Sequence, residues 1–109
     1  MTESETIANE LGLQYYSLDS IGIQSVAYDK SNATRIIEYC RNEVLPVIGI
    51  DIYRLNAGNV ELPKLYDNWN CNKRCHESFS GFANRSCIEA MDYICSKRFD
   101  DNTLFDIVI

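Results

Sequence analysis

The stretch at residues 46–71, PVIGIDIYRLNAGNVELPKLYDNWNC, decides the fold of this chain. It opens with an apolar run at 47–52 that closes on Tyr53 and is bounded by Pro46 and by the turn Asn-Ala-Gly-Asn at 56–59. A short β-branched run with such boundaries predicts a largely buried strand rather than a helix. Asp51 lies inside this run. Since an isolated buried carboxylate is costly, its side chain must reach solvent or find a donor.

Three further segments have the composition of strands. Residues 60–62 follow the turn, and Pro63 either ends this strand or confines it to an edge of the sheet. Residues 65–71 alternate large and polar side chains, which predicts a third strand or an ordered loop. The closing run at 104–109 is a strand by composition, and its apolar side chains need a partner. The strand at 47–53 is the expected partner.

Two segments have helical periodicity. In residues 31–44 apolar side chains recur at spacings of three and four; they are Ala33, Ile36, Ile37, Cys40 and Val44. A second helix is predicted from Asn84 or Ser86 to about Phe99. It has two adjacent apolar rows, namely Cys87, Ala90 and Ile94, and Ile88, Met91 and Cys95. The polar stretch at 72–84 between the strands and this helix is interpreted as a loop.

The N-terminal segments are less regular. Residues 4–12 predict a short helix capped by Ser4 and stopped by Gly12. Ile21 and Ile23 alternate with polar or small residues, which predicts a short extended stretch. We therefore expect one domain at 1–109 with an α/β or α+β fold. A sheet of three to five strands, centred on 47–53 and 104–109, should be covered by the helices at 31–44 and 84–99.

Composition limits the classes of function. The chain has 109 residues, 46% of them hydrophobic and 24% charged, as in ordinary globular domains. Its net charge is −6, from 16 acidic and 10 basic residues. Direct nucleic-acid binding requires a basic surface, so the charge has the wrong sign for it and favours a basic protein partner instead.

The sequence also predicts where the protein acts. No apolar run approaches the roughly 18 residues of a membrane span, and the acidic N-terminus lacks the features of a signal peptide. A cytoplasmic protein without membrane contact is expected. Five cysteines without a signal peptide argue against a disulfide framework.

The cysteines still offer one alternative function. Cys71, Cys75 and His76 are ligand types that zinc prefers, with Cys87 and Cys95 downstream. Structural zinc sites usually present tight Cys pairs, however, and the spacings here do not match them. A Cys-His nucleophile also requires a geometry that sequence neighbours do not guarantee. We expect neither metal nor cofactor, and keep a small metal- or thiol-dependent protein as the alternative.

Acidic and aromatic residues surround the central strand. Asp51, Glu61 and Asp67 would suit acid–base chemistry or a divalent ion if they met on one side of a sheet. Tyr53, Tyr66 and Trp69 lie close to them in sequence and are residue types enriched at the centres of protein interfaces. An acidic and aromatic surface for a basic partner is the stronger interpretation, so catalysis is not expected.

These same residues resemble a known family. The motifs that carry the resemblance are Gly49-x-Asp51-x-Tyr53, Tyr66-Asp67-Asn68-Trp69, Arg85-Ser86, Ala90, Tyr93-Ile94 and the closing apolar strand. In order and spacing they are similar to the immunity protein 40 family of bacterial polymorphic-toxin and contact-dependent growth inhibition systems. The similarity spans residues 21 to 109, and Ile48 departs from it where a second small residue is expected.

The resemblance implies a non-catalytic cytosolic protein that binds and neutralises a cognate toxin domain. Many such toxins are nucleases with basic clefts, so the charge of −6 favours a basic nuclease, most plausibly an RNase, whose active-site cleft the protein blocks. The expected toxin-binding residues are Asp51, Tyr53, Glu61, Tyr66, Asp67 and Trp69.

Overall fold

The computed structural model describes residues 2–64 and 67–109, which form an α+β fold. Ten elements follow one another along these residues: α1 (Glu3–Leu11), β1 (Tyr16–Ser17), the 3₁₀ helix η1 (Asp19–Ile21), β2 (Val26–Ala27), α2 (Lys30–Asn42), β3 (Gly49–Asn56), β4 (Asn59–Glu61), β5 (Asn68–Asn70), α3 (Phe79–Ile94) and β6 (Thr103–Val108). The predicted fold class, with a small sheet against two main helices, is confirmed.

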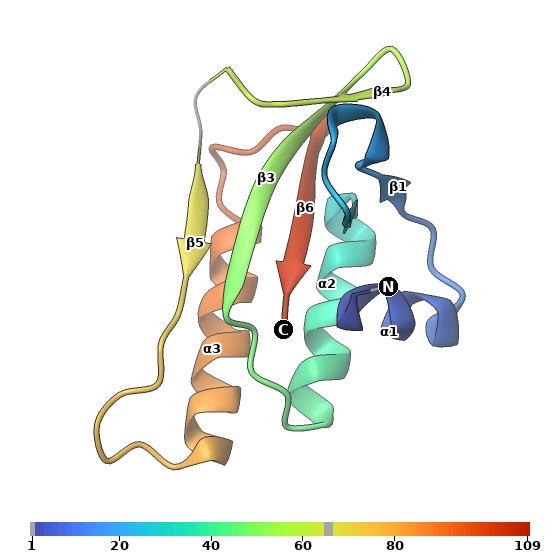
Figure 1. The fold of residues 1–109 in the computed structure, drawn as a ribbon. Coiled ribbons are helices and arrows are strands. Elements are labelled where there is room, and N and C mark those ends of the chain that lie inside the picture. The colour runs from blue at the N-terminus through green and yellow to red at the C-terminus, as the bar shows by residue number, and fades with distance from the viewer. Residues whose placement is uncertain (1, 65–66) are drawn as a thin grey trace.

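The main sheet is built around β3 (Figure 1). Strand β6 pairs antiparallel along one edge of β3, from Gly49 opposite Val108 to Arg54 opposite Thr103. Strands β5 and β4 share the other edge, with β5 at the start of β3 and β4 at its end. The predicted pairing of the central run with the closing strand is therefore confirmed.

A tight hairpin joins β3 to β4. Ala57 and Gly58 have φ angles of 51° and 82°, and two successive positive values match the twist of the paired strands. The turn at 56–59 and the short strand after it are therefore as predicted, with Pro63 just beyond the strand end. The stretch at 65–71 contains β5, although residues 65 and 66 lie outside the described part of the chain.

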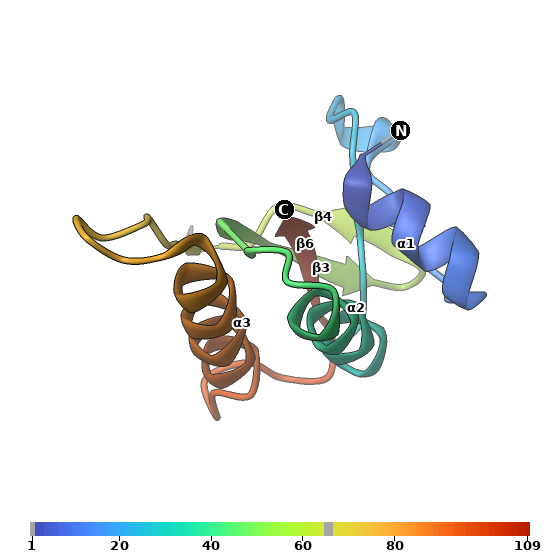
Figure 2. The same ribbon diagram turned by 90° about the horizontal axis from the view of Figure 1, so that it is seen from below.

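Helices α2 and α3 cover one face of the sheet (Figure 2). The helical side chains at the interface are those that periodicity selects, including Ile36, Ile37 and Ala90, all of them buried. Val44 is an exception: α2 ends at Asn42, and Val44 is 42% exposed with a φ of 57°. Its prediction as a core residue was wrong because the apolar spacing continues past the end of the helix.

The opposite face is half covered. The excursion at residues 16–27, comprising β1, η1 and β2, folds over the end of the sheet that carries Tyr53 and Leu104. Leu18 and Ala27 pack against these two side chains in a second, smaller core. The extended stretch expected at Ile21 and Ile23 was wrong, because the amides of both residues bond to the carbonyl of Leu18 in a compact turn.

The ends of two helices also differ from expectation. Helix α3 begins at Phe79, capped by the Ser78 side chain, which accepts a hydrogen bond from the Gly81 amide, and it ends at Ile94. The sequence Ser-Phe-Ser-Gly at this first turn lacks the apolar spacing of a helix. The predicted bounds of 84–99 were therefore wrong and lie too far along the chain at both ends. Cys95 therefore lies past the helix and is exposed. In α1 the cap is Thr2 rather than Ser4, while Gly12 stops the helix as predicted.

A buried serine ties α3 to the start of the sheet. Ser86 is fully buried, accepts a hydrogen bond from the Val47 amide at 3.0 Å and donates to the Ala83 carbonyl. The change Ser86→Ala removes the oxygen acceptor of the buried Val47 amide and leaves it only the weaker acceptor, the Cys87 sulfur. We expect it to lower the free energy of unfolding by about 1–3 kcal/mol, measured by urea denaturation. The exposed change Ser20→Ala is the control, and equal stabilities of the two variants would contradict this role.

Candidate functional site

The strand register sorts the side chains of the main sheet onto two faces. Ile50 and Ile52 point to the helices, so Gly49, Asp51 and Tyr53 point to the other side. Residues directly opposite Gly49 and Asp51 share that side. The excursion at 16–27 covers the Tyr53 end. The remaining residues of this side are Gly49, Asp51, Asn68, Asn70, Asp106 and Val108, and we call them the open face; Gly49 and Asp106 are buried within it, and the other four are at least partly exposed.

Two carboxylates stand side by side on the open face. Asp51 of β3 is directly opposite Asp106 of β6 in the antiparallel ladder. Directly opposed side chains lie about 5 Å apart at their Cβ atoms, and like charges in this position are destabilising. Asp51 is partly exposed, whereas Asp106 is only 6% exposed.

Asp106 is a titratable group at an unfavourable position. Burial raises the pKa of its carboxyl to about 6, with a further contribution from Asp51 and an opposing one from a hydrogen bond with the Ser25 side chain. Within the described part of the chain, no Lys or Arg lies within ion-pair distance of it. At neutral pH the protein thus holds a buried negative charge to which no described Lys or Arg is paired.

A small polar cavity adjoins Asp106. Its volume is about 120 Å³, and its lining comprises Thr2, Glu3, Ser4, Ser25, Asp106, Ile107, Val108 and Ile109. The first turn of α1 thus forms one wall and the end of β6 another. The hydroxyls of the α1 turn are ordered by contacts of Ser4 Oγ with Thr2 Oγ1 at 3.2 Å and with the buried Tyr28 hydroxyl at 3.1 Å. Among the described residues of this lining, Glu3 has the one other charged side chain.

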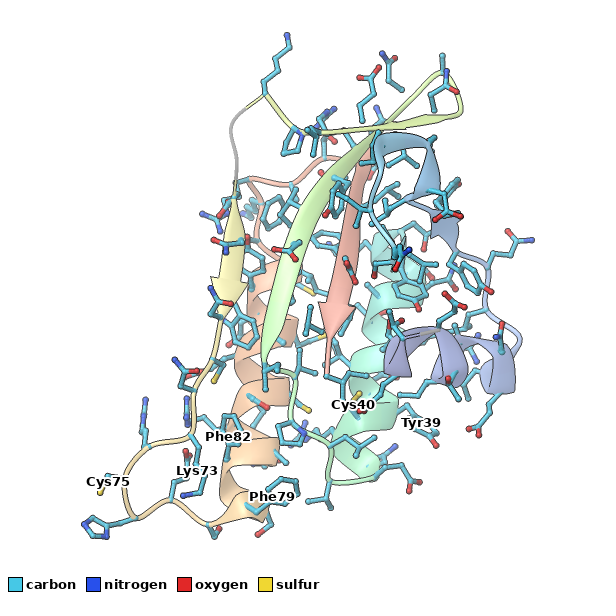
Figure 3. All side chains as sticks on the ribbon, viewed as in Figure 1. Tyr39, Cys40, Lys73, Cys75, Phe79 and Phe82 are labelled. Atoms are coloured by element: carbon cyan, nitrogen blue, oxygen red, sulfur yellow. The ribbon has the colours of Figure 1, made fainter. Side chains whose placement is uncertain are left out.

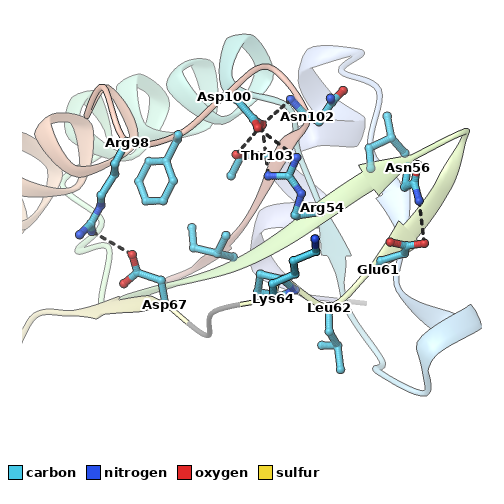
Figure 4. Close-up of a pocket in the computed structure, with 14 residues that line it drawn as sticks. Arg54, Asn56, Glu61, Leu62, Lys64, Asp67, Arg98, Asp100, Asn102 and Thr103 are labelled. Atoms are coloured by element: carbon cyan, nitrogen blue, oxygen red, sulfur yellow. Dashed lines mark hydrogen bonds and ion pairs between the residues drawn. The ribbon is translucent and has the colours of Figure 1, made fainter.

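A larger groove lies at the other end of the sheet (Figure 4). It has a volume of about 790 Å³ and lies between the segment after β4 and the loop that joins α3 to β6. Arg54 binds Asp100 through two contacts of 3.0 and 3.3 Å, and Arg98 binds Asp67 at 3.2 Å. Its acids and bases are therefore largely paired, so the groove has little excess charge.

The residues predicted from sequence are divided among these places. Asp51 lies on the open face, while Glu61 and Asp67 line the groove, where Asn56 donates to Glu61 at 3.1 Å. Tyr53 is 7% exposed beneath the excursion at 16–27. Tyr66 lies outside the described residues. Asp106 was missed, although it is an acid inside an apolar strand, the same signal that drew attention to Asp51.

Trp69 belongs to an aromatic stack between β5 and α3. Its ring stacks on that of Tyr93 with the centroids 6.3 Å apart and the planes inclined by 29°, and Tyr93 in turn meets Phe99 edge-on at 5.1 Å. The Arg98 guanidinium lies 4.9 Å from the ring centres of both Tyr93 and Phe99. Burial and the nearby Asp67 carboxylate raise the pKa of Tyr93 to about 12. This stack anchors β5 to α3.

The thiols lie in different surroundings. Cys40 and Cys87 are buried between the helices, and burial raises the pKa of Cys40 to about 12. Figure 3 shows Cys75 far from Cys40, on the loop at residues 72–77 before α3, which we call the projecting loop. Cys71 is buried, and its sulfur donates to Glu89 and accepts from Arg85. Across residues 2–64 and 67–109, no three His, Cys, Asp or Glu side chains are grouped as metal ligands.

Arg85 organises this projecting loop. Its guanidinium binds both carboxylate oxygens of Glu77 at 2.7 and 2.9 Å, Glu89 at 3.0 Å and the Asn72 carbonyl at 2.8 Å. Glu77 also accepts the Arg74 amide. These bonds lower the pKa of Glu77 to about 2, with Arg85 as the main cause. One arginine thus connects α3 to both ends of the loop.

Comparison with known proteins identifies the class as that of immunity proteins, whose role is to neutralise a cognate toxin. The model of Immunity protein 40 matches residues 17–109, so the chain belongs to the immunity protein 40 family. No curated protein and no solved structure gives a significant match. In the described residues, no helix has the length and apolar character needed to span a membrane. Helix α1, with the cavity wall that it forms, lies outside the matched range.

The change Asp106→Asn tests the cost of the buried charge. Between the ordinary carboxyl pKa of 3.8 and about 6, the folded state keeps a proton that the unfolded state has lost, so the free energy of unfolding falls as pH rises through this window. Asn keeps the shape and an acceptor for Ser25. We expect the variant to be more stable by about 1–3 kcal/mol at pH 7 and indistinguishable near pH 4, measured by urea denaturation. An equal difference at both pH values would contradict a charge effect, and Asp92→Asn is the exposed control.

The change Arg85→Lys tests the loop anchor. Lysine keeps the positive charge but cannot make the forked contact with Glu77. We expect the pKa of Glu77 to rise toward its ordinary value and the amides at 72–77 to exchange faster with solvent. An NMR titration and hydrogen exchange measure the two effects. Unchanged exchange in this loop would show that Arg85 does not hold it.

Proposed function

We propose that this chain is a non-catalytic inhibitor that acts in the cytoplasm. It binds a basic nuclease toxin domain, with an RNase as the favoured candidate, and blocks the substrate cleft of that toxin. The observation that carries the proposal is the uneven distribution of charge. Residues 1–29 contain no Lys or Arg but five acids, which are Glu3, Glu5, Glu10, Asp19 and Asp29. This segment therefore accounts for most of the net charge of −6.

The folded chain keeps this excess on one side. The described ion pairs are formed by Arg54, Arg85 and Arg98, which lie on β3 at the groove, on α3 and in the loop after α3. Helix α1 and the excursion at 16–27 lie instead beside β6 and over the other face of the sheet (Figures 1 and 2). The acids of residues 1–29 thus lie on the same side as Asp51 and Asp106, away from the described ion pairs.

An acidic surface of this kind suits a nuclease. The cleft of a nuclease presents cationic side chains to the phosphates of its substrate, and an inhibitor with carboxylates at matching positions competes for the same charges. Long-range attraction also accelerates the encounter, which matters for a protein that must capture a toxin before it acts. The proposal follows from family membership together with this charge distribution.

The test is binding to the C-terminal domain encoded by the gene immediately upstream, across a salt series. We expect a stable complex whose association rate falls about tenfold or more between 50 and 300 mM salt, because screening weakens the attraction. A complex that does not respond to salt would contradict the charge-based mechanism. The absence of any complex would contradict the assignment of this toxin as partner.

Matched variants locate the effect. The triple change Glu3→Gln, Glu5→Gln and Asp19→Asn removes three charges from the N-terminal segment. The triple change Glu38→Gln, Asp92→Asn and Asp101→Asn removes three exposed charges elsewhere. Surface plasmon resonance should show a slower association for the first triple variant and a smaller effect for the second. Equal effects would mean that net charge alone matters.

A further inference from the structure

The part of the open face around Asp51 and Asp106 combines three unusual features. Two carboxylates face the same side at directly opposed positions of the ladder. One of them, Asp106, is 94% withdrawn from solvent and has a hydroxyl partner but no described cationic partner. A cavity of about 120 Å³ adjoins it. A fold selected only for stability would place an apolar or neutral residue at this position.

The remainder of the face is shaped for contact rather than for core packing. The excursion at 16–27 covers the Tyr53 end with apolar side chains and reaches Asp106 through Ser25, while Asp51 stays partly exposed. Around these carboxylates, Asn68 and Asn70 are exposed on β5, and Val108 is 37% exposed on β6. Amides beside an apolar side chain form a mixed surface of the kind found at protein interfaces.

Among the described residues, the charged side chains that border Asp106 and its cavity are all acidic. Asp51 approaches it from β3, and Glu3 from the first turn of α1 across the cavity. The buried Tyr28 phenol, which is neutral at physiological pH, lies close enough for its proton affinity to respond to Asp106. None of the described residues that line the cavity is a base. A cation that entered here would be attracted by every charged neighbour.

We propose that the toxin domain docks on the open face and that one of its basic side chains, an arginine by preference, inserts beside Asp106 and Asp51. This inference rests on the proposed function and identifies the surface that performs it. An arginine fits best because its planar guanidinium can donate to two adjacent carboxylates at once. The inserted cation would supply the counterion that Asp106 lacks in the free protein.

Proton linkage gives the inference a specific signature. In the free protein Asp106 binds a proton near pH 6, and an inserted cation would expel it. Association should therefore release about half a proton per complex at pH 6, and affinity should rise by about tenfold between pH 5 and pH 7. A residue that only maintained the fold would give neither effect.

The experiment is calorimetric titration with the domain from the upstream gene at pH 6, in two buffers of different ionisation enthalpy. The wild type, Asp106→Asn and Asp51→Asn are compared, with Asp92→Asn and Glu38→Gln as controls. We expect Asp106→Asn to weaken binding about 30-fold or more and to abolish Asp106-linked proton release. Asp51→Asn should weaken binding by a smaller factor, and the controls should stay within about twofold of the wild type.

The outcomes separate this inference from the proposed function. If the wild type binds and both open-face variants bind equally well, the docking surface is elsewhere, although the toxin remains the partner. If Asp106→Asn weakens binding but leaves proton release unchanged, no cation sits at Asp106 and the inference is overturned. If the wild type itself does not bind the domain, the proposed function fails and this inference fails with it.

Discussion

The antiparallel pairing of β3 with β6 is the constraint on which the rest of this structure depends. It joins the middle of the chain to its last strand through six consecutive residue pairs. Ile50, Ile52, Phe105 and Ile107 thereby form one continuous apolar surface for α2 and α3. The same register brings Tyr53 and Leu104 together on the other side, where they support the excursion at 16–27. A shift of one residue would exchange the two faces and remove both cores.

This register also creates the candidate site. Asp51 and Asp106 are 55 positions apart in sequence, and only the ladder makes them neighbours. Neither carboxylate is strained by local backbone geometry. The cost comes from their shared face and from the closure of α1 beside β6. The unfavourable charge is therefore a property of the assembled sheet and cannot be removed by local rearrangement.

The sequence predicted most of the fold because periodicity and turn chemistry are local. The hairpin at 56–59 and the apolar faces of the two main helices follow from spacing alone. The prediction was wrong at two kinds of place. The start of α3 is set by the cap at Ser78, where the sequence has no helical periodicity, and the alternating residues around Ile21 form a compact turn instead of a strand. The candidate site was less accessible. Asp51 and Asp106 each give a local signal, as acids inside apolar strands. That the two side chains stand directly opposite each other could not be predicted, because register is set by long-range pairing.

The pairing of charges explains why three polar surfaces of this protein differ in their attraction for a charged partner. In the groove at the end of the sheet, each arginine is matched by an adjacent carboxylate, so the field beyond the surface is small. At the projecting loop, Arg85 is surrounded by Glu77 and Glu89, and its bonds are used to hold the loop. Only around Asp106 does the described structure leave a buried charge uncompensated.

An uncompensated charge lowers the stability of the free protein and strengthens its attraction for a cation, and both effects have the same origin. Natural proteins retain such local conflicts chiefly where function requires them. The family match covers residues 17–109, which include both strands of the sheet pairing, whereas α1, which walls the Asp106 cavity, precedes the matched range. A cation held at Asp106 would therefore depend on two parts of the chain at once, the β3–β6 ladder that places the carboxylates side by side and the first turn of α1 that walls the cavity beside them.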